Sequence, residues 1–190
     1  MRVIGGALRG RRLVAPEGLA TRPTSDRARQ TLFDVLLHAP WGGRALLEGA
    51  RVLDAFAGTG ALAIEALSRG AAEAVLFETD ARAIAAIRRN LAACGLAARA
   101  RVLRADATRP PAADRPARLV FLDPPYGAGL VERAVPALAS AGWIAPGTVL
   151  VVETADEEAV LLEGFAPLDD RRVGRARLRV LRATTGATVA

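Results

Sequence analysis

Histidine, cysteine and lysine are nearly or wholly missing from this sequence of 190 residues. The one cysteine, Cys94, excludes an intrachain disulfide and a metal site built from clustered cysteines. The one histidine, His38, argues against a histidine-triad hydrolase and a multi-histidine metal centre. We therefore expect no metal, a cytoplasmic setting, and structural roles for both residues.

Long apolar runs are also absent. No stretch reaches the roughly 20 apolar residues that a membrane-spanning helix needs, and the arginine-rich N-terminus lacks the hydrophobic region of a signal peptide. Hydrophobic residues nevertheless make up 52% of the chain, which is enough for a full core. The length suits one α/β domain with an appendage. We therefore expect a monomer without a membrane partner.

Positive charge is carried entirely by arginine, with 26 arginines and a net charge of +6. Residues 1–29 contain seven of them against two acids, Glu17 and Asp26, which gives this segment a net charge of +5. A basic segment ahead of a nearly neutral body favours a polyanionic partner such as RNA or DNA. Charge alone supports only non-specific affinity, so a solvated basic face is the alternative interpretation.

The N-terminal segment is predicted to contain a hairpin and a helix. Glycines and arginines at residues 3–14 indicate a short hairpin. Apolar residues at helical spacing predict a helix over about 26–37, with Thr24 or Ser25 as its cap. Free N–H groups at a helix N-terminus favour phosphate. The candidate RNA-binding residues are Arg9, Arg11, Arg12, Arg22, Thr24, Arg27 and Arg29.

The rest of the chain alternates strands with helices. Strands are predicted at 52–56, 74–78, 100–103, 118–122 and 148–152, helices at 62–69, 81–94, 130–139 and 156–162, and a final strand at 171–182. This alternation indicates a mostly parallel sheet with helices on both faces. Two final strands without a long helix between them indicate an antiparallel hairpin at one edge. We therefore divide the chain into an RNA-binding extension, residues 1–40, and an α/β domain, residues 41–190.

A glycine-rich loop follows the first predicted strand. Its glycines allow a tight turn and the close approach of a ligand at a helix N-terminus. Glu78 lies 20 positions after Gly58, at the end of the next strand, which suits a carboxylate that accepts from ribose hydroxyls. The pattern formally fits a dinucleotide, so NAD is a candidate beside S-adenosylmethionine. The candidate cofactor-binding residues are Asp54, Phe56, Gly58, Gly60, Glu78 and Asp106.

Two features favour S-adenosylmethionine over NAD. The Asp54 carboxylate would repel a pyrophosphate and attract the ammonium and sulfonium groups of S-adenosylmethionine. The chain also lacks room for the separate substrate domain of many dehydrogenases and an evident histidine for hydride relay. Asp106, after the third predicted strand, is then expected near the adenine. The alternative interpretation of Asp106 is a surface acid in a turn, without a role in cofactor binding.

The fourth predicted strand stops abruptly at an acid, two prolines and an aromatic residue. Proline donates no ladder hydrogen bond, so the chain leaves the sheet at the carboxyl end of the strand, where ligands bind in open α/β sheets. The Asp123 carboxylate and the Pro124 carbonyl can accept both N–H groups of an exocyclic amine and aim its lone pair at a methyl group. Tyr126 can stack on the base. The candidate catalytic residues are Asp123, Pro124, Pro125 and Tyr126.

The glycine loop and Asp-Pro-Pro-Tyr together resemble the amino-methyltransferases of adenine N6, cytosine N4 and guanine N2. The fuller set of motifs resembles the RsmD family, whose members methylate N2 of one guanine in 16S ribosomal RNA. These motifs are Arg2-Val3-Ile4-Gly5-Gly6, Arg9-Gly10-Arg11, Arg22-Pro23-Thr24-Ser25-Asp26-Arg27, Thr31-Leu32-Phe33, Asp54-Ala55-Phe56-Ala57-Gly58-Thr59-Gly60-Ala61-Leu62, Glu65-Ala66-Leu67-Ser68-Arg69 and Asp123-Pro124-Pro125-Tyr126. The resemblance covers nearly the whole chain. It implies a Rossmann-like class I S-adenosylmethionine-dependent methyltransferase fold with an N-terminal hairpin extension.

The resemblance also implies roles for the candidate residues. Asp54, Gly58 and Gly60 would line the cofactor site, Glu78 would take the ribose, Asp106 would lie by the adenine, and Asp123 to Tyr126 would hold the amine. The family often has phenylalanine where this chain has Tyr126, an exchange that preserves stacking, and commonly has two threonines where this chain has Thr24-Ser25.

The implied partner is 16S ribosomal RNA within a small-subunit particle. Three other functions stay open as alternatives: a DNA or RNA adenine-N6 methyltransferase, an NAD-binding oxidoreductase and a non-catalytic RNA-binding module. The absence of a target-recognition domain argues against a DNA methyltransferase. An intact Asp123 and an intact glycine loop argue against a non-catalytic module.

Overall fold

The structure is a computed structural model that describes residues 1–15, 26–156, 160, 162–174 and 176–185. Its α-helices are α1 (Asp26–His38), α2 (Arg44–Leu47), α3 (Ala61–Ser68), α4 (Ala81–Ala93) and α5 (Leu130–Ser140), and its short 3-10 turns are η1 (Gly6–Leu8) and η2 (Ala97–Arg99). Its strands are β1 (Arg51–Asp54), β2 (Glu73–Glu78), β3 (Ala100–Arg104), β4 (Leu119–Leu122), β5 (Val149–Ala155), β6 (Phe165–Val173) and β7 (Ala176–Ala183). No helix within these described ranges is long and apolar enough to cross a membrane.

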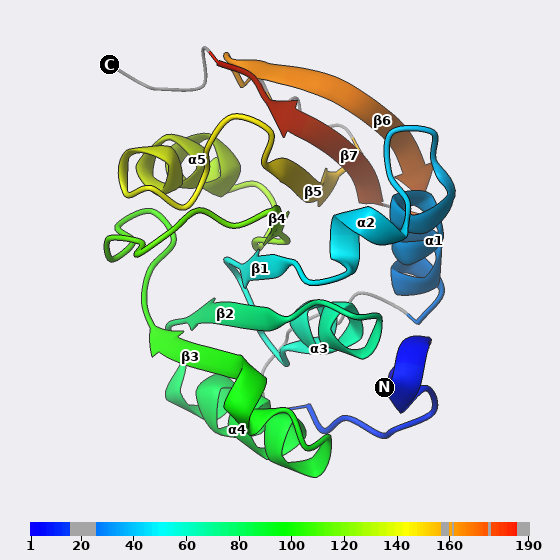
Figure 1. Ribbon diagram of the computed structural model, residues 1–190. Coiled ribbons are helices and arrows are strands. Elements are labelled where there is room, and N and C mark those ends of the chain that lie inside the picture. The colour runs from blue at the N-terminus through cyan, green and yellow to red at the C-terminus, as the bar shows by residue number, and fades with distance from the viewer. Residues whose placement is uncertain (16–25, 157–159, 161, 175, 186–190) are drawn as a thin grey trace.

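All seven strands form one sheet, in the order β3-β2-β1-β4-β5-β7-β6 (Figure 1). Strands β1 to β5 are parallel, and β7 is antiparallel to both β5 and β6. The chain enters the sheet at β1, moves outward to β3 and then returns to β4 beside β1. The strand order therefore reverses between β1 and β4, which is where open α/β sheets bind ligands. The predicted mostly parallel sheet with an antiparallel C-terminal hairpin is confirmed.

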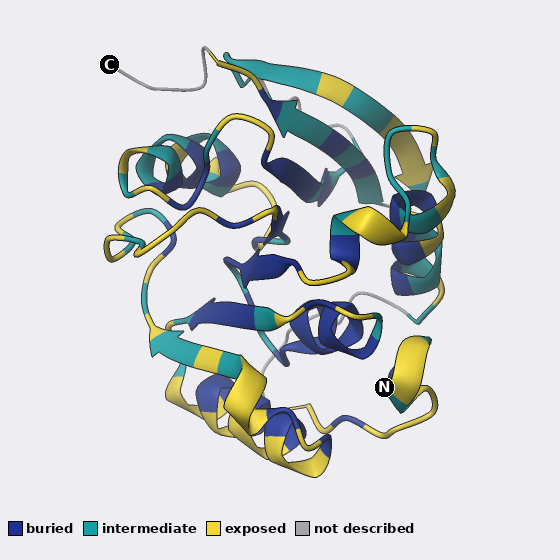
Figure 2. Ribbon diagram, in the orientation of Figure 1, coloured by how far each residue is buried: buried dark blue, intermediate teal, exposed yellow. Residues whose placement is uncertain are grey.

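Helices cover both faces of the sheet. Residues of α1, α3 and α4 pack with one set of strand side chains, and residues of α5 pack with the other set, together with Trp143. Strands β1 and β4 are buried along their whole length. Figure 2 shows β1 and β4 in dark blue, while α4 has a yellow outer side. Burial on both faces explains why these strands are continuous apolar runs in the sequence without an alternating pattern.

The C-terminal edge differs from the sequence prediction. A single strand over 171–182 is wrong, because β6 ends at Val173 and β7 begins at Ala176. Between them Gly174 has a φ of +66°, a left-handed conformation that suits glycine in a turn. The alternating apolar residues Leu178 and Val180 belong to β7 alone. The helix predicted at 156–162 lies mostly outside the described residues, as does the capping pair at 24–25.

Residues 1–15, which we call the arm, form a narrow antiparallel loop. The Val3 N–H donates to the Arg11 carbonyl at 2.9 Å, and the Leu13 N–H donates to the Met1 carbonyl at 3.1 Å. The short turn η1 connects the two sides, which share one β-bridge, between Arg2 and Arg12. The predicted hairpin is therefore present over the described residues of the arm as a single bridge in place of an extended ladder.

Candidate active site

A cavity of about 710 Å³ lies at the carboxyl ends of β1 to β4, at the point where the strand order reverses. Its volume is typical of a small-molecule site. Most of the candidate cofactor residues and all four candidate catalytic residues line it. Those predicted residues are Asp54, Phe56, Gly58, Glu78, Asp106, Asp123, Pro124, Pro125 and Tyr126. The structure therefore brings together residues from four strands that the sequence separates by up to 72 positions.

The Glu78 side chain holds the glycine loop in place. Its Oε2 accepts the Gly58 N–H at 2.8 Å, and its Oε1 accepts the N–H groups of Thr79 and Asp80 at 2.7 and 2.9 Å. These bonds fix the carboxylate between the end of β2 and the loop after β1. Glu78 thus faces the cavity and also holds the glycine loop through these hydrogen bonds. The spacing from Gly58 did not predict this second, structural role.

Gly58 and Gly60 have different roles in the loop. Gly58 has a φ of +52°, lines the cavity and has open space where a Cβ would stand, which allows a ligand to approach the backbone. Gly60 is not among the described residues that line the cavity. It begins α3 with a φ of +76°, and a Cβ there would lie 3.2 Å from Leu76 and 3.3 Å from Ile87. We therefore assign Gly60 to packing beneath the loop.

Asp54 is a buried acid on the cavity wall, with an exposed fraction of 1%. Burial raises its pKa to about 7, and the negative charges of Asp123 and Glu78 act in the same direction. The N–H groups of Ala63 and Phe56 oppose this shift, but neither carboxylate oxygen makes a hydrogen bond of ordinary geometry to a described residue. When it is ionised, the buried Asp54 carboxylate therefore lacks a partner among the described residues that compensates for its desolvation. The site is therefore suited to a cationic ligand.

The Asp123-Pro124-Pro125-Tyr126 segment follows β4 as predicted and lines the same cavity next to the end of β1. Asp123 lies close enough to Asp54 to raise the pKa of that residue. The Tyr126 ring is 40% exposed, and its hydroxyl donates to Glu153 Oε1 at 3.0 Å. Glu153 belongs to β5, so the neighbouring strand positions the aromatic ring at the mouth of the cavity.

Asp106 lies on the cavity wall beyond β3. Its Oδ1 accepts both the N–H and the hydroxyl of Thr108 at 2.8 Å. These hydrogen bonds lower the pKa of Asp106, and Arg109 and Arg133 contribute in the same direction. The residue is therefore an ionised acceptor at neutral pH, within the cavity but at a different wall from Asp54.

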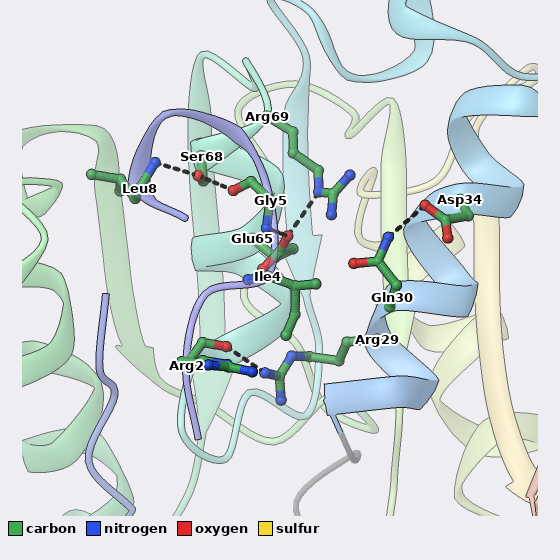
Figure 3. Close-up of polar contacts among 10 residues, drawn as sticks. All are labelled: Arg2, Ile4, Gly5, Leu8, Arg29, Gln30, Asp34, Glu65, Ser68 and Arg69. Carbon is green, nitrogen blue, oxygen red and sulfur yellow. Dashed lines mark hydrogen bonds and ion pairs between the residues drawn. The ribbon is translucent and has the colours of Figure 1, made fainter. Parts of the chain in front are cut away.

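The candidate RNA-binding residues divide into three groups. Arg9, Arg11, Arg12 and Arg27 are exposed. Arg22 and Thr24 lie outside the described residues. Arg29 is 1% exposed and donates to the Arg2 carbonyl at 2.6 Å (Figure 3). It also donates to Asp26 at 2.8 Å and lines the cavity. Its guanidinium therefore joins the arm to α1, and the phosphate contact expected of Arg29 stays a prediction.

Sequence reasoning missed the side chains that dock the arm. Glu65 on α3 accepts the N–H groups of Ile4 and Gly5 at 2.8 and 2.7 Å and the Arg69 Nε at 2.8 Å (Figure 3). Ser68 accepts the Leu8 N–H and donates to the Gly5 carbonyl. Because the four bonds between the arm and α3 join residues 60 to 63 positions apart, no local pattern could have predicted them.

Comparisons with known proteins agree with this geometry. A family model described as "Conserved hypothetical protein 95" matches residues 1–182. The chain is 41% identical over 161 residues to Ribosomal RNA small subunit methyltransferase D of Escherichia coli K12, which covers 84% of this chain and 77% of that protein. It superposes on the putative methyltransferase yhhF from Escherichia coli with a TM-score of 0.83 and 33% identity, covering 97% and 98% of the two chains. An RNA methyltransferase from Salinibacter ruber, solved in complex with S-adenosyl-L-homocysteine, shares the fold at a TM-score of 0.62 and 18% identity, over 85% and 94%.

Proposed function

The chain belongs to the "Conserved hypothetical protein 95" family, the RsmD family, and from this we propose that it methylates the exocyclic N2 amine of a guanine in 16S ribosomal RNA, with S-adenosylmethionine as the methyl donor. Its fold is that of class I S-adenosylmethionine-dependent methyltransferases. The observation that carries the proposal is the pair of acids Asp54 and Asp123, which face one cavity from adjacent parallel strands.

The cofactor's chemistry fits the residues on the β1 and β2 side of the cavity. S-adenosylmethionine supplies an electrophilic methyl group on a sulfonium, together with an ammonium group. The buried Asp54 carboxylate gains a cationic partner, which compensates for its desolvation. Glu78 and Asp106 are carboxylates on the cavity wall that can accept hydrogen bonds from ribose hydroxyls and from the adenine amine.

We assign the target amine to the part of the cavity that Asp123 to Tyr126 form after β4. The Asp123 carboxylate and the Pro124 carbonyl accept its two N–H groups, which keeps the nitrogen from conjugating fully with the base and turns its lone pair toward the methyl group. The new N–C bond would form as the S–C bond to the methyl group breaks and the sulfur leaves as a neutral thioether. The methylated nitrogen would then have to lose one proton, and the Asp123 carboxylate that accepts its N–H is placed to take it. The exposed ring of Tyr126 stacks on the base. Positioning of the two reactants supplies most of the acceleration.

The choice of small-subunit ribosomal RNA is supported by the name of the Escherichia coli relative. The choice of guanine N2 rests on the resemblance of the sequence motifs, those of the arm included, to the RsmD family. The exposed Arg9, Arg11, Arg12 and Arg27 supply the positive charge that an RNA backbone requires. A base in a folded RNA reaches such a cavity only from a loop or after it has been flipped out.

The test is methyl transfer from labelled S-adenosylmethionine to 16S ribosomal RNA, offered both free and within small-subunit particles. Digestion to nucleosides and chromatography then identify the product. We expect label in N2-methylguanosine, at a single site. Label in N6-methyladenosine would assign the protein to the adenine-directed enzymes, and label only in DNA or protein would exclude ribosomal RNA as the substrate. Binding of NAD in place of S-adenosylmethionine would exclude methyl transfer altogether.

A further inference from the structure

Residues 81–105 contain six arginines and neither an aspartate nor a glutamate. This segment forms α4, η2 and β3, at the edge of the sheet farthest from the C-terminal hairpin. Its charge of +6 equals the net charge of the whole protein. With residues 1–29 at +5, the remainder of the chain carries −5. Positive charge is therefore concentrated in residues 1–29 and in the segment that forms this one edge.

Four of the six arginines are available to a partner. Arg88, Arg89, Arg101 and Arg104 are exposed, and the described part of the structure gives them no ion pair. The other two are engaged: Arg82 pairs with Asp80 at 3.1 Å, and Arg99 donates to the carbonyls of Ala71 and Ala72. We call Arg88, Arg89, Arg101 and Arg104 the edge surface. Figure 2 shows the outer side of α4 as exposed, and in β3 the exposed residues are Arg101 and Arg104.

The edge surface is continuous with the arm. Val14 of the arm is hydrogen-bonded to Asn90, the residue next to Arg89, at 2.8 and 3.0 Å. Arg11 lies close enough to Cys94, just beyond α4, to oppose the rise in pKa that burial gives that thiol. Figure 1 shows the arm running beside α4. Arg11 and Arg12 therefore extend the same positive surface.

Helix α4 connects the edge surface to the cavity. Asp80 and Ala83, at the N-terminal end of α4, line the cavity wall. Arg89 follows Asp80 by nine residues, which corresponds to about 14 Å along the helix. A nucleic-acid strand that places one base in the cavity could therefore lay its backbone along α4.

A competing role explains only part of the edge surface. Exposed charges on an edge strand prevent pairing with a strand of another molecule, and Arg101 and Arg104 of β3 suit that task. Arg88 and Arg89 belong to a helix, which has no free strand edge to protect. The charge on α4 therefore calls for a different partner.

We propose that the edge surface binds the phosphate backbone of the RNA on one flank of the methylated nucleotide, as a second contact in addition to the arm. The inference rests on the proposed function, because it takes the polyanion to be the methylation substrate. It predicts that the RNA footprint extends along α4 to β3 and does not cross the sheet to the acidic remainder of the molecule.

The test is the salt dependence of binding to a labelled fragment of 16S ribosomal RNA. The variant is Arg88→Gln/Arg89→Gln, and its matched control is Arg171→Gln/Arg172→Gln, which removes the same charge from β6 at the opposite edge of the sheet. We expect the first variant to bind about tenfold more weakly at low salt, with a slope of log affinity against log salt that is smaller by about 1.5. We expect the control to retain the slope of the unmodified protein, and both variants to bind S-adenosylmethionine unchanged.

The Arg88→Lys/Arg89→Lys variant tests whether the charge of the two side chains is sufficient. Lysine keeps the positive charge that contacts phosphate, so this variant should have the salt slope of the unmodified protein. Equal slopes for the glutamine variant and its β6 control would overturn the proposal. So would a loss of binding that appears with small-subunit particles but not with free RNA, which would assign the edge surface to a ribosomal protein. Failure of the unmodified protein to bind or methylate ribosomal RNA would instead refute the proposed function itself.

Discussion

Asn90 and Val14 are joined by a reciprocal pair of hydrogen bonds, in which the Val14 N–H donates to Asn90 Oδ1 at 2.8 Å and Asn90 Nδ2 donates to the Val14 carbonyl at 3.0 Å. The same Nδ2 donates to the Thr59 carbonyl in the glycine loop at 3.0 Å. Asn90 is 2% exposed. One buried amide thus connects the arm, α4 and the loop that faces the cofactor cavity.

Replacing Asn90 with alanine should destabilise the protein and loosen the glycine loop. The change leaves the buried Thr59 carbonyl and the partly buried N–H and carbonyl of Val14 without their partner, which costs about 2 kcal/mol. We expect a lower midpoint of urea unfolding and weaker S-adenosylmethionine binding in calorimetry. Gln30→Ala is the control, because among the described residues its amide bonds only the exposed Asp34 on the same helix, and its loss should change stability by less than about 0.5 kcal/mol. Equal stability of the two variants would show that the Asn90 bonds contribute nothing net.

The strands and the two loops of the site could be predicted from the sequence because each has a local signal. The apolar run before Asp123 ends at two prolines, and the run before Gly58 ends at a glycine loop. Each break marks the carboxyl end of a parallel strand, and such ends meet at one edge of the sheet.

The joint between the arm and the main domain had no such signal. Arg29 resembles any helical arginine, and only the packed structure shows that it is buried against the Arg2 carbonyl. Asn90 lies in a helix whose sequence gives no reason to expect a hydrogen bond to a residue 76 positions away. Side-chain contacts across the fold depend on how the elements pack, so they become visible only when the elements are assembled.

Replacing Glu65 with alanine should detach the arm. Glu65 and Arg69 are 1% and 9% exposed, so removal of the carboxylate leaves a nearly buried guanidinium and two backbone N–H groups without an acceptor. Breaking such a pair costs about 3–5 kcal/mol. The free energy of unfolding in urea measures the loss, and Asp34→Ala provides a control at an exposed carboxylate on α1. Glu65→Gln, which keeps an acceptor oxygen, should lose less; a larger loss for glutamine than for alanine would contradict this account.

Asp54 should make the stability of the ligand-free protein fall as pH rises from about 4 to about 7. The pKa of this carboxyl is raised to about 7 in the folded protein from an ordinary value of 3.8, so the unfolded chain releases this proton at lower pH than the folded one does. The destabilisation is complete above pH 7 and amounts to about 4 kcal/mol. Asp54→Asn should remove this pH dependence, as measured by urea unfolding at pH 4, 5.5 and 8. A parallel pH profile for the variant and the unmodified protein would refute the assignment.

Cofactor binding should show the opposite trend with pH. A cationic ligand prefers ionised Asp54. As pH rises toward 7, affinity for S-adenosylmethionine should therefore increase about tenfold per pH unit, and above pH 7 it should level off. Binding at pH 6 should release a proton, which calorimetry detects in buffers of different ionisation enthalpy. Asp54→Asn should bind weakly and without proton release. Affinity that is independent of pH between 5.5 and 7.5 would show that Asp54 does not contact the cation.

Replacing Asp123 with alanine should abolish methyl transfer while preserving cofactor binding. The variant lacks the acceptor that orients the amine, for which we expect a fall in kcat of at least about 100-fold. Removing the Asp123 charge should also lower the pKa of Asp54, because that charge is one of the causes that raise it. Affinity for S-adenosylmethionine at pH 6 should therefore increase. Unchanged turnover would refute the role of Asp123 in transfer, and unchanged affinity at pH 6 would refute its coupling to Asp54.

Tyr126 should contribute to turnover through its ring more than through its hydroxyl. The hydroxyl bonds Glu153 at 3.0 Å in a half-exposed position, where one hydrogen bond contributes about 1 kcal/mol or less. Base stacking on an aromatic ring is worth about 1–3 kcal/mol. Tyr126→Phe should therefore lower kcat/KM by about fivefold or less, and Tyr126→Ala by about 10- to 100-fold, in single-turnover assays on ribosomal RNA. If phenylalanine were as damaging as alanine, the bond to Glu153 would be the feature that positions the base, and Glu153→Ala should then reproduce the same loss.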